Sequence, residues 1–359
     1  MHPQRESRLL SAPVEIRRAI YAMIIPREIH AFLSRGRLRL SVCLEPNLGD
    51  DSHDGRERRS GTDHEGISKW ARRLRSSWGP HWECEETSHA RYQSNIHGFL
   101  FLCKQVFFEV SDIMTEIAAI NVTDLETLSI LLGRDQSKDV FNYSWILWEH
   151  ICFTNIRKLN LTFRLPVASY RELEDEDTVP RQMSTESTVR ALWASSWPDL
   201  LISRELRSLH IWLDHDNSSS WSTVKERMVL RTLSAALTAH KQAPSQTETP
   251  QAPDVVVSLP KLHPGMAAPG SHFTQDSLSL PFTIQRRYRQ RWHCKETSNG
   301  DLDIQYRPDF PIMEELRHLE PDREWTLQGI EELEITLLES GEDVEAVFGE
   351  LLNSPSICY

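Results

Sequence analysis

The chain has 359 residues, and its 52 acidic residues against 40 Lys and Arg give a formal net charge of −12 at pH 7. A global acidic excess disfavours nucleic acid as a partner, because binding to the phosphate backbone depends on clustered Lys and Arg. Hydrophobic residues make up 39% of the chain, and each of its 11 tryptophans needs a packing site. The composition therefore predicts a folded globular protein.

The sequence also bears on location. The apolar run 19–25 is too short to span a bilayer and is closed by Pro26. The cysteines are widely scattered, which indicates free thiols in a reducing compartment rather than a disulfide framework. They are Cys43, Cys84, Cys103, Cys152, Cys294 and Cys358. We therefore expect an intracellular protein, cytoplasmic or nuclear, that does not bind membranes.

The segment LLSAPVEIRRAIYAMIIP, residues 9–26, predicts an amphipathic helix that ends at Pro26. Pro13 suits the first helical turn, where its missing N–H costs nothing, and Glu15 complements the positive end of the helix dipole. Apolar side chains then recur every three to four positions and form one stripe. The stripe consists of Ile16, Ile20, Met23 and Ile24.

A hairpin and two more helices are expected in the next hundred residues. Residues 27–44 alternate polar and apolar side chains around a turn in which Gly36 supplies a positive φ. Residues 45–65 are polar and aperiodic, which predicts a disordered loop. Helical spacing returns over 70–78 and again over 99–117. The apolar face of the second of these helices holds Leu102, Val106, Val110, Ile113 and Ile117.

Three segments in the rest of the chain share a strand-like pattern. NIRKLNLTF, ELRSLHIWL and GIEELEITL, which begin at Asn155, Glu205 and Gly329, each place alternate apolar residues as leucine-rich repeats do. Their spacing is too wide and uneven for a simple repeat solenoid. Segments with helical character lie between them, and DVVVSLP, at 254–260, predicts a further buried strand. This order of strands and helices predicts a parallel or mixed sheet covered by helices.

The predicted fold is therefore mixed α/β. We expect a helical head with an inserted hairpin over residues 1–120, and an irregular sheet-and-helix domain over residues 121–359. Two biased stretches, 171–186 and 241–253, predict flexible linkers in the second domain.

Metal binding is the first chemistry to consider. His81 and Cys84 are spaced as a pair of ligands, His89 lies nearby, and His293 and Cys294 are adjacent far downstream. A structural zinc site needs two such pairs at suitable spacing, and only one local pair exists. The sequence therefore favours ordinary side chains over a metal site, and we expect no metal and no cofactor.

Two further segments carry charged side chains. Asp214, His215 and Asp216 follow a predicted strand, where α/β enzymes often place catalytic groups, but a polar turn is the simpler interpretation. In FTIQRRYRQRWH, which begins at Phe282, a strand would place Arg287, Arg289 and Arg291 on one face, with aromatic side chains on the other. The acidic balance of the chain favours an exposed strand or an acidic protein partner over nucleic acid for this segment.

The opening helix resembles the F-box pattern of a leucine, Pro-x-Glu-Ile and an Ile-Tyr turn. The matching residues are Leu10, Pro13, Glu15, Ile16, Ile20 and Tyr21. The segment FLFLCKQVFFEVSDIM, from Phe99, is similar to the element that follows in many fungal F-box-like proteins. SSWGPHWECEE, WLDHD, VSLPKLHP and PFTIQRRYRQR extend the resemblance to an uncharacterised fungal family that carries this head.

This resemblance implies a function in substrate recruitment. Such a head docks on the Skp-type adaptor of a cullin ubiquitin ligase, while a downstream leucine-rich-repeat-like domain holds an unknown protein target. The implied contact is formed or supported by Pro13, Glu15, Ile16, Ile20 and Tyr21. The sequence thus favours a non-enzymatic protein-interaction module. Two alternatives remain: a structural or interaction domain whose helix 9–25 is buried in its own core, and an enzyme that uses the region of His215.

Overall fold

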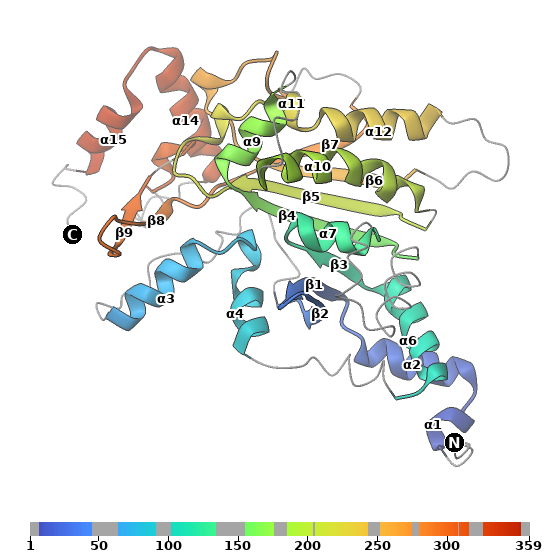
Figure 1. Ribbon diagram of the computed structural model, residues 1–359. Helices are drawn as coiled ribbons and strands as arrows, with labels where there is room; N and C mark the ends of the chain where they lie inside the picture. Colours follow the sequence, from blue (N-terminus) through green and yellow to red (C-terminus); the bar gives the residue numbers. More distant parts are fainter. Residues whose placement is uncertain are drawn as a thin grey trace.

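The computed structural model describes residues 7–44, 64–90, 102–133, 155–175, 185–203, 205–242, 252–274, 280–307, 309–315 and 326–352. Its centre is a seven-stranded sheet in the order β2-β1-β3-β4-β5-β6-β7, and a separate two-stranded sheet pairs β8 with β9 (Figure 1). Helices accompany the strands along the chain. This confirms the predicted mixed α/β fold.

The large sheet is parallel except at one edge. β1 pairs with β2 in antiparallel register, and every other neighbouring pair is parallel. The strands are β1 Glu28–Ser34, β2 Arg37–Val42, β3 Ala119–Val122, β4 Lys158–Leu165, β5 Ser208–His215, β6 Asp254–Pro260, β7 Thr283–Arg287, β8 Trp292–Glu296 and β9 Leu302–Tyr306. Since parallel neighbours follow one another along the chain, each needs a crossover connection, and most of these contain helices.

The helices lie on both sides of this sheet. Figure 1 shows α3 and α4 on one side of the strands, and α6 and α7 on the other. The α-helices are α1 Arg8–Ser11, α2 Val14–Ile24, α3 His64–Leu74, α4 Trp82–Ala90, α6 Lys104–Ile117, α7 Leu125–Leu131, α9 Val167–Glu174, α10 Thr185–Ile202, α11 Glu226–Val229, α12 Arg231–Gln242, α14 Leu327–Glu339 and α15 Val344–Leu352. Short 3₁₀ helices are η1 Gly79–His81, η2 Trp221–Thr223, η3 Pro264–Met266 and η4 Ile312–Glu315. None of these described helices is both long and apolar enough to cross a bilayer.

The N-terminal predictions hold with one change. The expected helix over 9–25 is divided into α1 and α2, because Pro13 adopts an extended conformation as the N-cap of α2. The hairpin is confirmed: Arg35 and Gly36 both have positive φ, at 53° and 67°, as a two-residue turn requires. The predicted loop at 45–65 falls almost wholly outside the described residues.

The main core lies between the sheet and the helices α6, α7, α10 and α12. Leu159, Leu209 and Val255 are register partners on neighbouring strands, and all three are buried in one hydrophobic cluster. Because side chains alternate along a strand, the leucines of β4 and the run Leu209, Ile211 and Leu213 of β5 point to this side, and Trp212 points to the other. The first two predicted strand-like segments and DVVVSLP are therefore confirmed as adjacent strands.

The third strand-like segment is a correction. GIEELEITL forms most of α14 rather than a strand. Ile330, Leu333 and Leu337 fit a helical face as well as a strand-like alternation, and they pack with η4 and α15 in a small cluster. Thr326 caps the helix by accepting a hydrogen bond from the backbone N–H of Gly329, which favours the helix.

The sheet and its core continue across the expected domain boundary. The boundary near residue 120 falls inside β3, which pairs with β1 from the head on one side and with β4 on the other. The main hydrophobic cluster extends from Tyr21 to Phe282. Of the two expected linkers, residues 171–174 belong to α9, and 176–184 and 243–251 lie outside the described residues.

The opposite face of the sheet is covered in part by η1 and its neighbours. Gly79 has a positive φ of 56°, and a Cβ atom built there would lie 2.7 Å from the Trp212 ring. The backbone thus approaches β5 more closely than any other residue type allows. This contact fixes the segment 64–90 against the sheet.

Gly79→Ala should therefore destabilise the protein by about 3 kcal/mol, the sum of a strained φ and an overpacked contact. Gly300→Ala is the matched control, because Gly300 also has a positive φ, of 83°, but open space around it. We expect it to cost only about 1 kcal/mol. Urea unfolding of both variants measures the difference, and equal losses would contradict a close approach at Gly79.

Candidate functional site

Helix α2 packs on α6 through one side and leaves the other side open. Tyr21 is only 1% exposed and belongs to the main core, and Arg17 is also buried. The apolar stripe predicted from the sequence lies on the remaining surface of the helix. Its exposed fractions are 52% for Ile16, 37% for Ile20, 85% for Met23 and 41% for Ile24. We call these four residues the α2 surface.

The α2 surface is held in place by ion pairs beneath it. Arg17 donates two hydrogen bonds to Glu109 of α6, at 2.9 and 2.5 Å, and one to the carbonyl oxygen of Ala12 at 2.6 Å. Its guanidinium group is the main reason that the pKa of Glu109 is lowered. Arg18 pairs with Asp112 and Glu116 on the same helix. A bidentate pair of this kind fixes orientation as well as distance.

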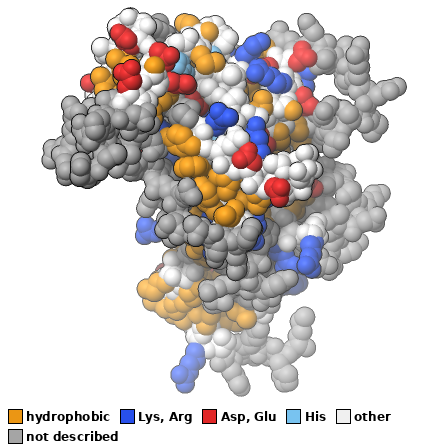
Figure 2. Space-filling model, turned by 90° about the vertical axis from the view of Figure 1, so that its left-hand side faces the viewer, with side chains coloured by type: hydrophobic (Ala, Val, Ile, Leu, Met, Phe, Trp, Pro, Cys, Tyr) orange, Lys and Arg blue, Asp and Glu red, His pale blue; other side chains and the backbone are white. Residues whose placement is uncertain are grey.

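Exposed apolar side chains also occur on α6 and just before it. Phe108 and Leu102 are both more than half exposed. Figure 2 shows hydrophobic side chains gathered in the lower part of the molecule, at the height of α2 in Figure 1. Contiguous exposed apolar surface is typical of a protein-interaction site.

Of the predicted docking residues, four are exposed and one is buried. Pro13, Glu15, Ile16 and Ile20 are exposed, whereas Tyr21 lies beneath them in the core. The first four are accessible to a partner, and Tyr21 can only support their positions. The alternative of a helix buried in its own core thus describes Tyr21 and Arg17, but the apolar stripe of the same helix is exposed.

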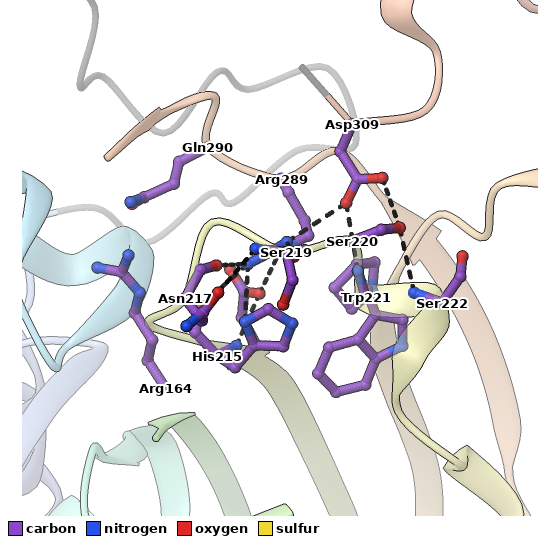
Figure 3. A network of polar contacts seen from close by, with 12 residues as sticks. Arg164, His215, Asn217, Ser219, Ser220, Trp221, Ser222, Arg289, Gln290 and Asp309 are labelled. Atoms are coloured by element: carbon purple, nitrogen blue, oxygen red, sulfur yellow. Dashed lines mark hydrogen bonds and ion pairs between the residues drawn. The ribbon is translucent and has the colours of Figure 1, made fainter. Parts of the chain in front are cut away.

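Asp214 and His215 lie at the end of β5 in a buried polar network (Figure 3). Its centre is Arg289, whose Nε lies 2.7 Å from Asp214 and whose guanidinium also contacts Asp309 at 3.3 Å. The same group donates to three backbone carbonyl oxygens, those of His215, Asn217 and Ser219. Arg289 therefore ties the end of β5 and the loop after it to the segment before β8.

The electrostatics of this network follow from burial and from Arg289. Burial would raise the pKa of Asp214, but Arg289, His215 and Arg164 together hold this pKa below its usual range, with Arg289 making the largest contribution of the three. Burial, followed by Arg289, lowers the pKa of His215 to about 4, so the ring is neutral near pH 7. Its Nδ1 accepts from Arg289 at 3.1 Å, and the ring stacks on Trp221. The ring is completely buried, and its Nε2 has no hydrogen-bond partner among the described residues. It cannot contact a substrate unless the chain opens locally.

The predicted basic face does not form. β7 ends at Arg287, so the three arginines do not share one strand. Arg287 donates to Ser258, Arg289 lies in the buried network, and Arg291 pairs with Glu314. Acidic residues of the chain itself thus neutralise Arg289 and Arg291, which leaves a weaker basis for an external anionic partner.

The second face of the sheet carries a row of polar side chains. Asn160 donates to Asn121 at 3.0 Å across the β3–β4 pair, and His210 is 2.7 Å from Ser258 across the β5–β6 pair. Asn160 and His210 are half-buried register partners. Asn121 and Ser258 are buried, so these side chains form a hydrogen-bonded polar layer within the fold.

One group of side chains could hold a metal ion. His30, Cys43, His81 and Cys84 are all buried, and their potential ligand atoms lie within 4.8 Å of one another. The sequence showed the 81–84 pair, and the hairpin supplies the second pair from upstream. His293 and Cys294, on β8, are not part of this group. The described cysteines form no disulfide.

The comparison with protein families gave one match. Residues 2–243 match the model of a family described as a domain of unknown function, DUF7730. No curated protein and no solved structure matches the chain.

Proposed function

The chain belongs to the DUF7730 family, and we propose that it is a non-enzymatic protein-interaction module. We infer that it acts as an F-box-type substrate adaptor, whose α2 surface docks on the Skp-type subunit of a cullin ubiquitin ligase. The part of the chain that follows the helical head would then hold the protein target.

One observation carries this proposal: the apolar stripe of α2 is exposed although the helix is firmly anchored. Ile16 and Ile20 fall in the segment that resembles an F-box, and they are among its exposed apolar residues. A rigid amphipathic helix with a free apolar face is suited to a groove on another protein. The ion pair between Arg17 and Glu109 supplies the rigidity, so a partner need not order the helix on binding.

The enzymatic alternative has less support. Asp214 and His215 are buried and engaged with Arg289, whereas Asp216 is exposed. Such an arrangement is typical of a structural ion-pair network, which also shifts pKa values. No described feature of this network offers a substrate access to the imidazole.

The test is direct binding of the purified chain to a purified fungal Skp-type adaptor, measured by titration calorimetry. We expect wild type to bind, and Ile16→Asp/Ile20→Asp to lose at least about 100-fold in affinity, because two charges would be buried in an apolar interface. Both positions are exposed, so the variant should unfold at the same temperature as wild type.

Ile202→Asp is the matched control, because Ile202 is an isoleucine of another helix and is 73% exposed at the end of α10. It should bind the adaptor as wild type does. The proposal is rejected if wild type does not bind the adaptor, or if Ile202→Asp weakens binding as much as the double variant.

A further inference from the structure

Four potential metal ligands converge where the N-terminal hairpin meets the segment 64–90. His30 lies on β1 and Cys43 directly follows β2, while His81 ends η1 and Cys84 lies in the first turn of α4. All four side chains are at least nine-tenths buried, and their ligand atoms lie within 4.8 Å of one another. We refer to them as the Cys-His cluster.

The distances in the Cys-His cluster fit a tetrahedral ion. Zinc–sulfur bonds of about 2.3 Å and zinc–nitrogen bonds of about 2.0–2.1 Å imply S···S edges of about 3.8 Å and S···N edges of about 3.6 Å. The Sγ atoms of Cys43 and Cys84 are 3.9 Å apart, and Cys43 Sγ is 3.4 Å from His81 Nδ1. A disulfide would need about 2.05 Å between the sulfurs.

His30 gives independent evidence for a ligand. It is completely buried, and neither of its ring nitrogens has a hydrogen-bond partner among the described residues. A buried imidazole without a partner costs free energy unless something satisfies it.

The surroundings suit a closed structural site. The ring of Trp78 lies 4.8 Å from that of His30 and 5.2 Å from that of Phe32, so aromatic side chains border the cluster. The backbone N–H of Leu44 donates to Cys84 Sγ at 3.2 Å, which stabilises a thiolate. Two thiolates and two neutral imidazoles make the zinc complex neutral overall, so its burial carries no net charge.

We propose that His30, Cys43, His81 and Cys84 bind one structural zinc ion, which fastens η1 and α4 to the hairpin edge of the sheet. The ion takes four protein ligands and leaves no open coordination position, so its role is structural rather than catalytic. This site lies apart from the α2 surface and does not depend on the function proposed for it.

The test is the metal content of the full-length protein after reconstitution with zinc under reducing conditions and gel filtration. We expect one zinc per chain by mass spectrometry. Cobalt in place of zinc should give the absorption of a tetrahedral ion with thiolate-to-metal charge transfer. Removal of zinc by a chelator should lower the melting temperature by at least about 10 °C, because the site exists only in the folded chain.

Cys43→Ser/Cys84→Ser should bind less than a tenth of the wild-type zinc. Cys103→Ser/Cys294→Ser removes two thiols outside the Cys-His cluster and should keep one zinc per chain. The wild-type measurement decides the matter even if the first variant fails to fold. The proposal would be overturned if wild type bound no zinc or if its cobalt form lacked the tetrahedral spectrum. It would also be overturned if Cys43→Ser/Cys84→Ser still bound one zinc per chain.

Discussion

Replacing Arg289 with methionine is expected to lower the free energy of unfolding by about 3–5 kcal/mol, because Asp214 would keep a buried charge without its partner. Both side chains are almost fully buried, and Arg289 also satisfies the backbone carbonyl oxygens of Asn217 and Ser219. Methionine fills a similar volume but supplies neither charge nor donors. Urea unfolding at pH 7.5 measures the loss.

Arg18→Met is the matched control for this variant. Arg18 also pairs with two carboxylates, those of Asp112 and Glu116, but these pairs are exposed to solvent. We expect a loss of at most about 1 kcal/mol. In addition, Asp214→Asn should restore part of the stability of Arg289→Met, since it removes the unpaired charge. Equal losses in the two single variants, or no recovery, would show that Asp214 and Arg289 are not coupled as the structure indicates.

The N-terminal helix shows what could and could not be predicted from the sequence. Periodicity identified α2, its end and its apolar stripe, because these depend on local propensities. The direction in which the stripe faces depends on the ion pair of Arg17 with Glu109, which is 92 residues away in the sequence. An arginine that turns inward and isoleucines that turn outward reverse the usual pattern, and such reversals are expected at functional surfaces.

The Cys-His cluster was missed for a related reason. The local pair His81 and Cys84 is visible in the sequence, but the other two side chains of the cluster lie upstream, on the hairpin strand β1 and directly after β2. His30 and Cys43 approach each other only through the hairpin, whose register allows the N–H of Cys43 to donate to the carbonyl oxygen of Glu28. A predicted hairpin that ends in cysteine and carries a histidine on its first strand is the signal that could have suggested the second pair.

The same limit applies to buried charges. Strand alternation over the whole segment 282–293 predicts that Arg287, Arg289 and Arg291 share one face. β7 ends at Arg287, and the acidic partners come from residues 214, 309 and 314. Pairings between distant charges follow from the tertiary fold, so sequence patterns alone cannot assign them.

Stability should fall as the pH decreases from 7.5 to 5, because two buried histidines remain neutral in the folded state. Burial and then Arg289 lower the pKa of His215 to about 4 and that of His293 to about 3, whereas an unfolded histidine titrates near 6.5. Between these values the unfolded chain binds more protons, so acidification favours unfolding. Each histidine should therefore lower the free energy of unfolding by about 2 kcal/mol when the pH is changed from 7.5 to 5.

The charges that surround both rings are fixed over this pH range. Arg164 and Arg289 oppose protonation of either ring, and Asp214 favours it. Glu28 and Glu334, whose pKa values are raised by burial, act in the opposite direction, because the folded state binds protons there more readily. Comparing variants at each pH separates the histidines from these groups and from all others.

In His215→Gln/His293→Gln these two contributions are absent, because glutamine does not titrate. Between pH 7.5 and pH 5 the free energy of unfolding of this variant should therefore fall by about 4 kcal/mol less than that of wild type. Urea unfolding at half-unit intervals of pH measures both curves. They should run parallel from pH 7.5 to 8.5, where an unfolded histidine is already neutral, and separate below about pH 6.5. Curves that stay parallel down to pH 5 would mean that these histidines accept protons in the folded state as readily as in the unfolded chain.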